Sequence, residues 1–473
     1  MRSRRHLRVA GSRARTVFIV LVLPLLAALC LAVGAKPAAA ADFTPGAPGT
    51  GDPCFPLSGN GGYDVAHYDL KLDYQPDGNV LKGRATVRAT ATQDLSRFDL
   101  DLRAFTVKRV LVDGVEATFA RDGQELVVTP VEGLAIGVTF TVTVRYAGVP
   151  ETIVDPNGDI NGWVPTSDGA CALGECQGSE AWYPVNDDPE DKATFDFDVT
   201  VPEGLTAVAN GILLSHKTAD GRTAWRWRET DPMAPYLATV ALGHFDLSEY
   251  EIDGIPTYVA IDPQLSKGQG LRKLPAILRF FVDLYGPYPF NAFGAIVDNA
   301  KFVGYALETQ TKPFYERMPD EWTLVHETAH MWYGDSVTLK DWPDIWLNEG
   351  FATFSNWVWS EEQGNQSAHQ AFKSNYSTGG WIWGLATGNL LDPADLFDWG
   401  GVYLRGAMTL QALREKIGDD EVFFGIMRTW AADHRHGTAT TPEFILLAEE
   451  KSGMQLDDFF RVWLYEPEKP VAW

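Results

Sequence analysis

The spacing of hydrophobic residues changes once along this chain of 473 residues, near residue 250. Over residues 63–249 apolar and polar residues alternate, as in Thr139–Arg145, and turn signals such as Asp113-Gly114 separate the runs. Alternation with a period of two predicts half-buried strands joined by tight turns. Beyond Ile252 the apolar residues follow helical spacing instead. The chain must therefore fold as a β half followed by a mostly helical half.

In the second half we also interpret two short segments, Ala295–Asp298 and Ser336–Leu339, as strands of a small sheet. Helices packed against such a sheet make α+β the fold class. We predict an extended lead-in at residues 42–62, rich in Gly and Pro, an antiparallel β domain at 63–250 and a mostly helical domain at 251–473. The predicted helices are Leu271–Leu284, Glu321–Tyr333, Ile345–Glu361, Val402–Ile417, Glu421–Ala432 and Pro442–Glu449.

The first 41 residues have the layout of a secretory signal: an arginine-rich start, an apolar run from Val17 to Val33, and Ala38–Ala41 as a cleavage region. We therefore expect a secreted protein with no stable membrane association after cleavage. The alternative is an uncleaved anchor, because the apolar run is near the lower limit for spanning a bilayer. The arginine pair at Arg4-Arg5 leaves the export route open.

The mature chain is strongly acidic. The whole sequence has a net charge of −24, and removal of residues 1–41 takes away seven basic and no acidic residues, leaving 32 basic and 63 acidic residues and a net charge of −31. Such a surface repels nucleic acid, so we expect no nucleic-acid partner.

Three cysteines remain in the mature chain. Cys171 and Cys176 are close enough in sequence to form a small disulfide loop in an oxidising compartment, which leaves Cys54 unpaired. The alternative is that all three are reduced and partly buried.

A metal-binding pattern lies in the predicted helix at residues 321–333. His326 and His330 are four residues apart, on one face of the helix, so both rings can reach one ion. Catalytic zinc sites use three protein ligands and an open position, and Glu349, on the next predicted helix, can complete the set. Glu327 lies about 100° around the helix from His326, so it can act as general base toward a water. Two buried histidines held by hydrogen bonds are the alternative interpretation of the pair.

These residues resemble the aminopeptidase N family of zinc peptidases, which are gluzincins of peptidase family M1. The shared pattern is His-Glu-x-x-His followed after eighteen residues by a Glu within Trp-Leu-Asn-Glu-Gly-Phe-Ala, here Trp346–Ala352, and the similarity extends through Trp332–Asp335 and, in the β half, Tyr183–Ala193. The resemblance implies a saddle-like β domain followed by a thermolysin-like catalytic domain with one Zn²⁺. It also implies peptide substrates with a free N-terminus.

The resemblance assigns further roles. Glu308 falls at the family's amine-binding Glu, although Leu307 and Thr309 replace the usual Met and Asn around it and Tyr305 alters the preceding Gly. Glu175 falls at the second amine contact with Gln177 close by, and a solvated Glu in a local loop is the alternative there.

Tyr403, before Arg405-Gly406, matches the family's catalytic tyrosine, whose hydroxyl can stabilise the oxyanion. A core tyrosine is the alternative interpretation. The family often continues into a helical C-terminal region, whereas this chain stops at Trp473, so it resembles a short form, and we expect a more open cleft.

The sequence thus predicts a secreted zinc metalloaminopeptidase that uses Glu327 as general base. Two other classes stay open: a zinc endopeptidase or other zinc hydrolase on the same fold, and a binding protein that has lost its chemistry. Retention of Glu327 and Tyr403 beside three ligands argues against the second class.

Overall fold

The structure is a computed structural model in which residues 42–265 and 270–471 are described. The predicted signal sequence at residues 1–41 lies outside the described residues. Within this described part of the chain, no helix combines the length and the apolar character needed to cross a membrane.

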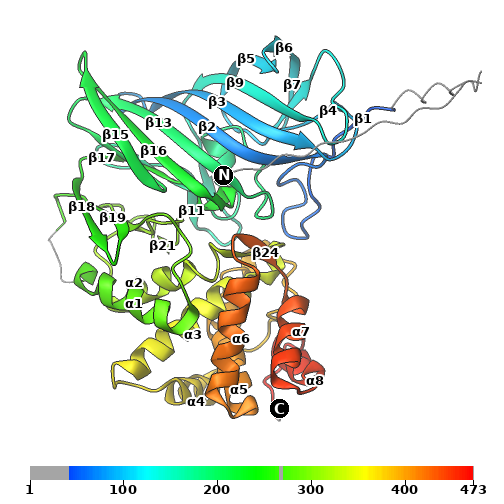
Figure 1. The fold of residues 1–473 in the computed structure, drawn as a ribbon, viewed down its shortest axis with the longest axis vertical. Coiled ribbons are helices and arrows are strands. Elements are labelled where there is room, and N and C mark those ends of the chain that lie inside the picture. The colour runs from blue at the N-terminus through cyan, green and yellow to red at the C-terminus, as the bar shows by residue number, and fades with distance from the viewer. Residues whose placement is uncertain (1–41, 266–269, 472–473) are drawn as a thin grey trace, which may run out of the picture. The chain divides into compact units, whose positions relative to one another are not determined.

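A large twisted sheet of eight strands forms most of the first half (Figure 1). All neighbouring strands pair antiparallel except β2 and β13, which run parallel and join two antiparallel blocks into one sheet. In spatial order the strands are β15 (Ile212–Ala219), β16 (Arg222–Met233), β13 (Ala193–Pro202), β2 (Tyr63–Gln75), β3 (Val80–Ala91), β9 (Thr139–Gly148), β5 (Thr106–Val112) and β6 (Val115–Glu116).

A second, five-stranded antiparallel sheet packs against the inner face of the large one. Trp227 of β16 donates its indole N–H to the carbonyl of Ala207 at 2.9 Å, and the rings of Tyr74 and Trp163 lie 5.5 Å apart. These contacts bury the apolar residues of both sheets between them. The strands of the second sheet are β10 (Thr152–Val154), β11 (Ile160–Pro165), β12 (Ala170–Leu173), β17 (Val240–Gly243) and β14 (Thr206–Ala209).

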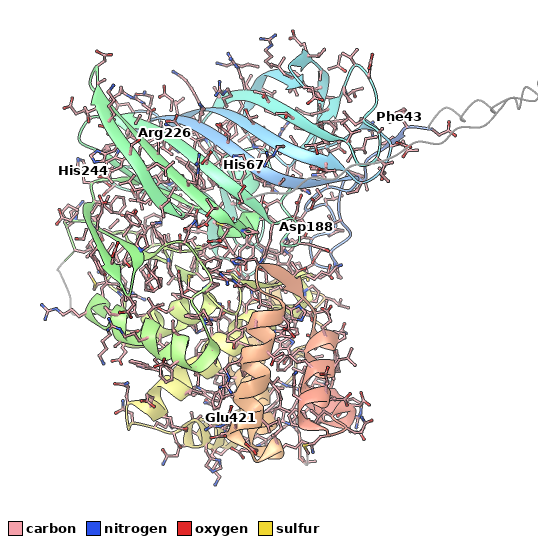
Figure 2. All side chains as sticks on the ribbon, viewed as in Figure 1. Phe43, His67, Asp188, Arg226, His244 and Glu421 are labelled. Carbon is pink, nitrogen blue, oxygen red and sulfur yellow. The ribbon has the colours of Figure 1, made fainter. Side chains whose placement is uncertain are left out.

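The large sheet shows the alternation that the sequence predicts. Trp225 and Trp227 are buried, whereas Arg226 between them is exposed. Figure 2 shows Arg226 and His67 along this sheet, from which polar side chains project. On the same face, Asp196 lies 3.7 Å from His67 and accepts two hydrogen bonds from Arg228. Period-two burial thus places one face on the core and one in solvent.

A third sheet begins the helical half. It consists of β18 (Asp246–Ile252), β19 (Ile255–Ile261), β20 (Phe293–Val297), β22 (Phe314–Tyr315) and β21 (Ala306–Leu307). Strand β20, buried throughout, is the apolar run expected at Ala295–Asp298. Three two-stranded pairs complete the strands: β1 (Thr44–Pro45) with β4 (Leu95–Arg97), β7 (Thr118–Asp122) with β8 (Glu125–Thr129), and β23 (Val337–Leu339) with β24 (Gly437–Ala439).

Helices fill the rest of the second half, below the sheets in Figure 1. They are α1 (Leu274–Tyr285), α2 (Glu321–His330), α3 (Trp346–Glu362), α4 (Ala368–Thr378), α5 (Arg405–Ile417), α6 (Asp420–Asp433), α7 (Thr441–Ser452) and α8 (Asp457–Phe460). Short 3₁₀ turns lie at Ser179–Ala181, Pro235–Leu237, Gly270–Lys273, Trp342–Asp344 and Pro393–Asp395, and π-helical turns at Trp399–Leu404 (η6) and Arg461–Tyr465 (η7). A β-rich half followed by a helical half confirms the predicted α+β class.

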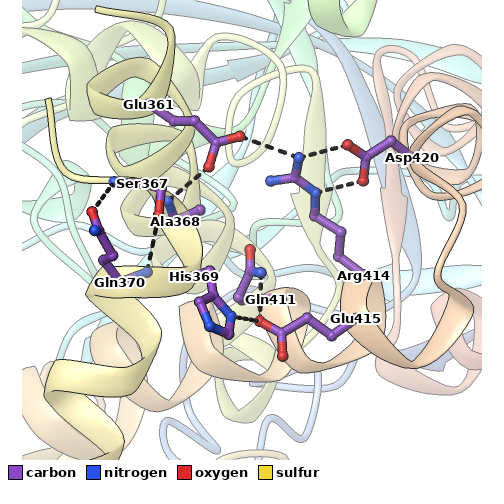
Figure 3. Close-up of polar contacts among 9 residues, drawn as sticks. All are labelled: Glu361, Ser367, Ala368, His369, Gln370, Gln411, Arg414, Glu415 and Asp420. Carbon is purple, nitrogen blue, oxygen red and sulfur yellow. Dashed lines mark hydrogen bonds and ion pairs between the residues drawn. The ribbon is translucent and has the colours of Figure 1, made fainter. Parts of the chain in front are cut away.

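Helix α4 has no counterpart among the predicted helices. Its sequence is polar and only a few of its side chains, such as Phe372, are buried, so its helical periodicity is weak. A capping box between Ser367 and Gln370 starts it and is the signal that could have revealed it (Figure 3). Nearby, Arg414 of α5 binds Glu361 at 3.2 Å and Asp420 at 2.7 Å, which ties the end of α3 to the start of α6.

The lead-in at residues 42–62 is extended but also packed. Asp52 accepts hydrogen bonds from the backbone N–H groups of Cys54 and Phe55, and its other oxygen accepts one from Trp342 at 2.7 Å. Phe55 lies edge-on to Trp342, with ring centroids 6.2 Å apart. The lead-in therefore fastens the start of the described chain to the helical half.

The predicted bond between Cys171 and Cys176 is wrong: both thiols are free and buried, as is Cys54. Cys171 lies inside strand β12, where its sulfur points back to the carbonyl of Val164 at 3.8 Å. Because β12 pairs with a strand on each side, the direction of the Cys171 side chain is fixed toward the core. It is therefore not free to turn toward Cys176 and close a short disulfide loop.

The free thiols lead to a testable expectation. Burial, followed by the charges of Asp52 and Asp392, raises the pKa of Cys54 to about 12, and burial also raises the pKa of Cys171 and Cys176. Protonated, buried thiols react slowly. A chain starting at residue 42 should therefore resist a thiol reagent when native and release three equivalents after denaturation without reductant. Reaction of only one thiol per chain would show instead that Cys171 and Cys176 form a disulfide.

Candidate metal centre and active site

Helix α2 presents both predicted histidines to one point in space. Asp320 caps the helix by accepting the backbone N–H of Thr323 at 2.8 Å, and the regular turn that follows places His326 and His330 on the same face. The Nε2 atoms of the two rings lie 2.9 and 3.5 Å from Oε2 of Glu349, which comes from the first turn of α3. All three side chains are buried. The ligand atoms predicted from the sequence therefore converge.

The surroundings of these side chains fit a zinc ion. Nδ1 of His330 donates to the carbonyl of Tyr333 at 3.0 Å, which turns Nε2 toward the carboxylate of Glu349 at 3.5 Å. Two imidazoles with one carboxylate are a zinc donor set. Burial raises the pKa of Glu349, but His330 and His326 outweigh it and lower that pKa to about 2. Glu349 is thus a carboxylate, as a ligand must be.

Two glycines bring α3 close to the segment that carries Tyr403. A Cβ on Gly350 would lie 2.8 Å from the Cα of Gly406, so the two helices touch backbone to backbone beside Glu349. Tyr403, in the π-helical turn η6 just before α5, consequently lies over His326, with ring centroids 5.9 Å apart and nearly parallel planes. Burial, followed by Glu349, raises the pKa of Tyr403 well above its ordinary value, so the phenol keeps its proton.

Three further carboxylates surround the metal ligands. Carboxylate oxygens of Glu308 and Glu327 and a ring nitrogen of His330 all lie within 4.8 Å of one another. Carboxylate oxygens of Glu175, Glu308 and Glu349 form a second group within the same distance. Burial raises the pKa of Glu308, which is 2% exposed, and of Glu327. One oxygen each of Glu175 and Glu308 is buried with no hydrogen-bond partner. These unpaired carboxylates can receive a positively charged ligand.

A cavity of about 410 Å³ opens over these side chains. Six lining residues are carboxylates, and none is Lys or Arg. The lining residues are Asp155, Asp159, Glu175, Gly304, Tyr305, Ala306, Glu308, Trp322, Thr323, His326, Glu327, His330, Glu349, Phe397, Trp399 and Tyr403. Of the residues predicted from sequence, Gln177 alone is not among them. A smaller cavity shares Trp322 and Trp399 with the first and is lined in addition by Trp381.

Several lining residues carried no recognisable signal in the sequence. Asp155 and Asp159 lie in an Asp-Pro-Asn-Gly-Asp stretch that reads as an ordinary turn. Tyr305 could be noticed only as a departure from the family pattern. Asn356 does not line the cavity, but its side-chain nitrogen lies 3.3 Å from Nδ1 of His326, behind the first metal ligand.

The contact of Asn356 leads to a prediction about metal affinity. When Nε2 of His326 binds zinc, Nδ1 carries the proton and needs an acceptor, which the Asn356 Oδ1 supplies after rotation of the amide. That oxygen is buried and otherwise has no partner. Asn356→Ala should weaken zinc binding about 10- to 100-fold in a chelator competition. Asn356→Asp, which keeps an acceptor, should retain the affinity; equal affinities for Ala and wild type would contradict the role.

Comparisons with known proteins agree with this geometry. The sequence profile of the Peptidase M1 N-terminal domain matches residues 65–237, and that of the Peptidase family M1 domain matches residues 306–463. Aminopeptidase N of Streptomyces lividans is 26% identical over 442 residues, covering 85% of this chain and 50% of that protein. Aminopeptidase N of Lactobacillus delbrueckii subsp. lactis is 25% identical, covering 86% of this chain and 51% of its own. The chain spans about half the length of these two relatives.

Solved structures match over a greater share of their length. An M1 zinc metallopeptidase from Deinococcus radiodurans superposes with a TM-score of 0.83 at 29% identity, covering 89% of this chain and 98% of that one. A mutant of that enzyme bound to a Tyr-Ser-Ala substrate gives the same TM-score at 28% identity. The likeness covers both halves of the fold.

Proposed function

This chain belongs to peptidase family M1, and from that premise we propose that it is a zinc aminopeptidase that removes the N-terminal residue of peptides. The observation that carries the proposal is the pair of carboxylates Glu308 and Glu175 beside Glu349. The ligand oxygens of the three residues lie within 4.8 Å of one another. Aminopeptidases named as such among the relatives support the same activity.

The two carboxylates define one end of a bound peptide. Buried carboxylates with unpaired oxygens gain most from an ammonium group, which can donate three hydrogen bonds. An α-amine held by Glu308 and Glu175 places the first peptide bond near the metal ligands. A chain that continued past the amine would collide with these side chains and leave their charges unpaired, so only the terminal bond is cut.

The remaining side chains of the site have separate roles in the hydrolysis. Zinc, when bound, lowers the pKa of a water molecule and polarises the scissile carbonyl. Glu327 accepts the proton of the attacking water and then delivers it to the nitrogen of the leaving amine. Tyr403, which keeps its proton, donates a hydrogen bond to the carbonyl oxygen as negative charge develops there. The stack of Tyr403 on His326 holds the phenol at the metal site.

A panel of free and N-acetylated aminoacyl fluorogenic amides tests this function. We expect hydrolysis of the free-amine compounds only, loss of activity after chelation, and recovery with zinc. Cleavage of acetylated compounds or internal cleavage of proteins would instead establish an endopeptidase. If the zinc-loaded protein hydrolysed none of the substrates, the binding-protein interpretation would replace this proposal.

The place of action is a separate proposal: we propose that the protein is secreted after removal of residues 1–41. The arginine-rich start, the apolar run and the alanine-rich region support it. Expression of the whole chain in a Gram-positive host, with N-terminal sequencing of protein from the medium, should find a start close to Ala41. Retention in the membrane fraction with residues 1–41 attached would show an uncleaved anchor.

A further inference from the structure

Two carboxylates of the main cavity have no part in the proposed chemistry. Asp155 and Asp159 lie in the turn that joins β10 and β11, in the β half of the chain, and both line the cavity that contains the metal ligands. The backbone N–H of Asp155 donates to the carbonyl of Asp159 at 2.9 Å, and that of Gly158 donates to Asp155 at 2.8 Å. The turn is therefore closed on itself, and both acids are held at the cavity wall.

Hydrogen bonds join this turn to the amine-binding side chains. The Asn161 amide donates both to the Asp155 carboxylate and, at 3.0 Å, to the backbone carbonyl of Glu175. The Tyr305 hydroxyl donates to the carbonyl of Ile160 at 2.8 Å. The turn, Glu175 and Tyr305 thus form one continuous wall. It is acidic, and no Lys or Arg lines the cavity to neutralise it.

We infer that Asp155 and Asp159 form a subsite for a positively charged first side chain, so that the enzyme prefers peptides with N-terminal arginine or lysine. This inference rests on the proposed function, because it places the α-amine between Glu175 and Glu308. The side chain of the first residue branches from the carbon that carries this amine. We place this side chain against the wall beside Glu175, which the Asn161 amide joins to the Asp155 carboxylate.

Electrostatics favour a cation at this place. A second positive charge relieves the repulsion among the acidic groups, and the half-enclosed cavity screens the attraction less than bulk water does. Tyr305 offers a ring to the aliphatic stem and to the guanidinium. An acidic first side chain would add a like charge, so we expect such peptides to be the poorest substrates.

The preference should depend on pH. Burial, followed by the charge of nearby Asp159, raises the pKa of Asp155 to about 6. The hydrogen bonds from Asn161 and the Cys176 backbone and the charge of Arg103 lower this pKa, but by less. The charged or titratable groups around it are Asp159, Glu175, Arg103, Cys176 and Tyr305. Above this pKa the Asp155 carboxylate is charged and attracts the substrate cation. The advantage of arginine over a neutral isostere should therefore shrink as the pH falls below about 6.

Arginine and citrulline amides provide the test, because they differ in charge and hardly in shape. For the zinc-loaded wild type at pH 7.5 we expect kcat/KM to be at least ~10-fold higher for arginine. In the Asp155→Asn/Asp159→Asn variant the ratio should fall to about 3-fold or less. The control, Glu132→Gln/Glu203→Gln, removes the same charge from exposed positions of the β half and should keep the wild-type ratio.

The outcomes separate this inference from the proposed function. Equal rates for arginine and citrulline in the wild type, or an unchanged ratio in the double variant, would overturn the inference while aminopeptidase activity stands. Absence of cleavage of every free-amine compound would overturn the proposed function first. If loss of the Asp155 hydrogen bonds prevents folding, Asp159→Asn alone should lower the ratio, and an unchanged ratio in that variant would also overturn the inference.

Discussion

Glu327→Gln should reduce kcat by about 10²- to 10⁴-fold while the zinc content stays at one ion per chain. Glutamine has the shape of glutamate but cannot accept the proton of the attacking water. The metal ligands His326, His330 and Glu349 do not include residue 327, so affinity for zinc is expected to remain. Steady-state kinetics on a free-amine amide and metal analysis of the same sample measure both quantities. A variant that keeps more than a tenth of the activity would remove Glu327 from the role of base.

The matched control lies on the same helix. Glu321, in the first turn of α2, is part-exposed and bonds Lys273 and Trp359, away from the cavity. Glu321→Gln should leave kcat within about twofold and cost at most about 1 kcal/mol of stability, as expected for a surface ion pair. Loss of zinc in Glu327→Gln but not in this control would show that Glu327 supports the metal instead of the proton transfer.

Glu327→Gln should also stabilise the metal-free fold. Burial raises the pKa of Glu327, and Glu308 and Glu349 raise it further against the effect of His330. A carboxyl whose pKa is raised by folding binds its proton more tightly in the native state, so its ionisation at neutral pH works against folding. Removing the charge should therefore raise Tm at pH 7.5 in chelator, and the gain should vanish near pH 4. Such a trade of stability for activity is typical of catalytic sites.

Local spacing was enough to predict that His326, His330 and Glu349 converge. The i, i+4 pair on α2 depends on helix geometry alone, and Glu349 falls in the first turn of the next helix. Residues that reach the site from the β half were harder to assign. Glu175 could be placed only through a family resemblance, and Asp155 not at all, because their positions depend on how strands β10 to β12 pair. Strand pairing is set by contacts distant in sequence, which periodicity does not encode.

Other features were missed for the same physical reason. The Asp52 side chain binds the backbone of Trp342 across 290 residues, so composition alone suggested no packing for the lead-in. Strands β2 and β13 pair parallel, and alternation of apolar and polar residues does not distinguish a parallel from an antiparallel neighbour. The cysteine prediction assumed that nearness in sequence brings two sulfurs together, whereas β12 fixes the direction of Cys171. Tertiary contacts override local signals in each case.

Glu308→Gln should lower kcat/KM for free-amine substrates by roughly 30- to 5,000-fold, corresponding to about 2–5 kcal/mol for a buried charge pair that loses one partner. The Glu308 carboxylate is 2% exposed and has a buried oxygen without a partner, so little water can replace it. An amide at this position accepts one hydrogen bond but offers no charge and presents N–H donors to an ammonium. The substrate amine then loses its main attraction at the point where it is held.

The decisive comparison is with substrates that have no charged amine. An N-acetylated amide gains nothing from Glu308, so its already low kcat/KM should not fall in the variant, and removal of the unpaired charge could only help it bind. The ratio of free to acetylated substrate should therefore collapse. If both substrates lost activity equally, Glu308 would act on the metal site or on folding, and the anchor would have to be Glu175. The same pair of substrates with Glu175→Gln measures how the amine's binding energy divides between the two carboxylates, since interacting groups are not additive.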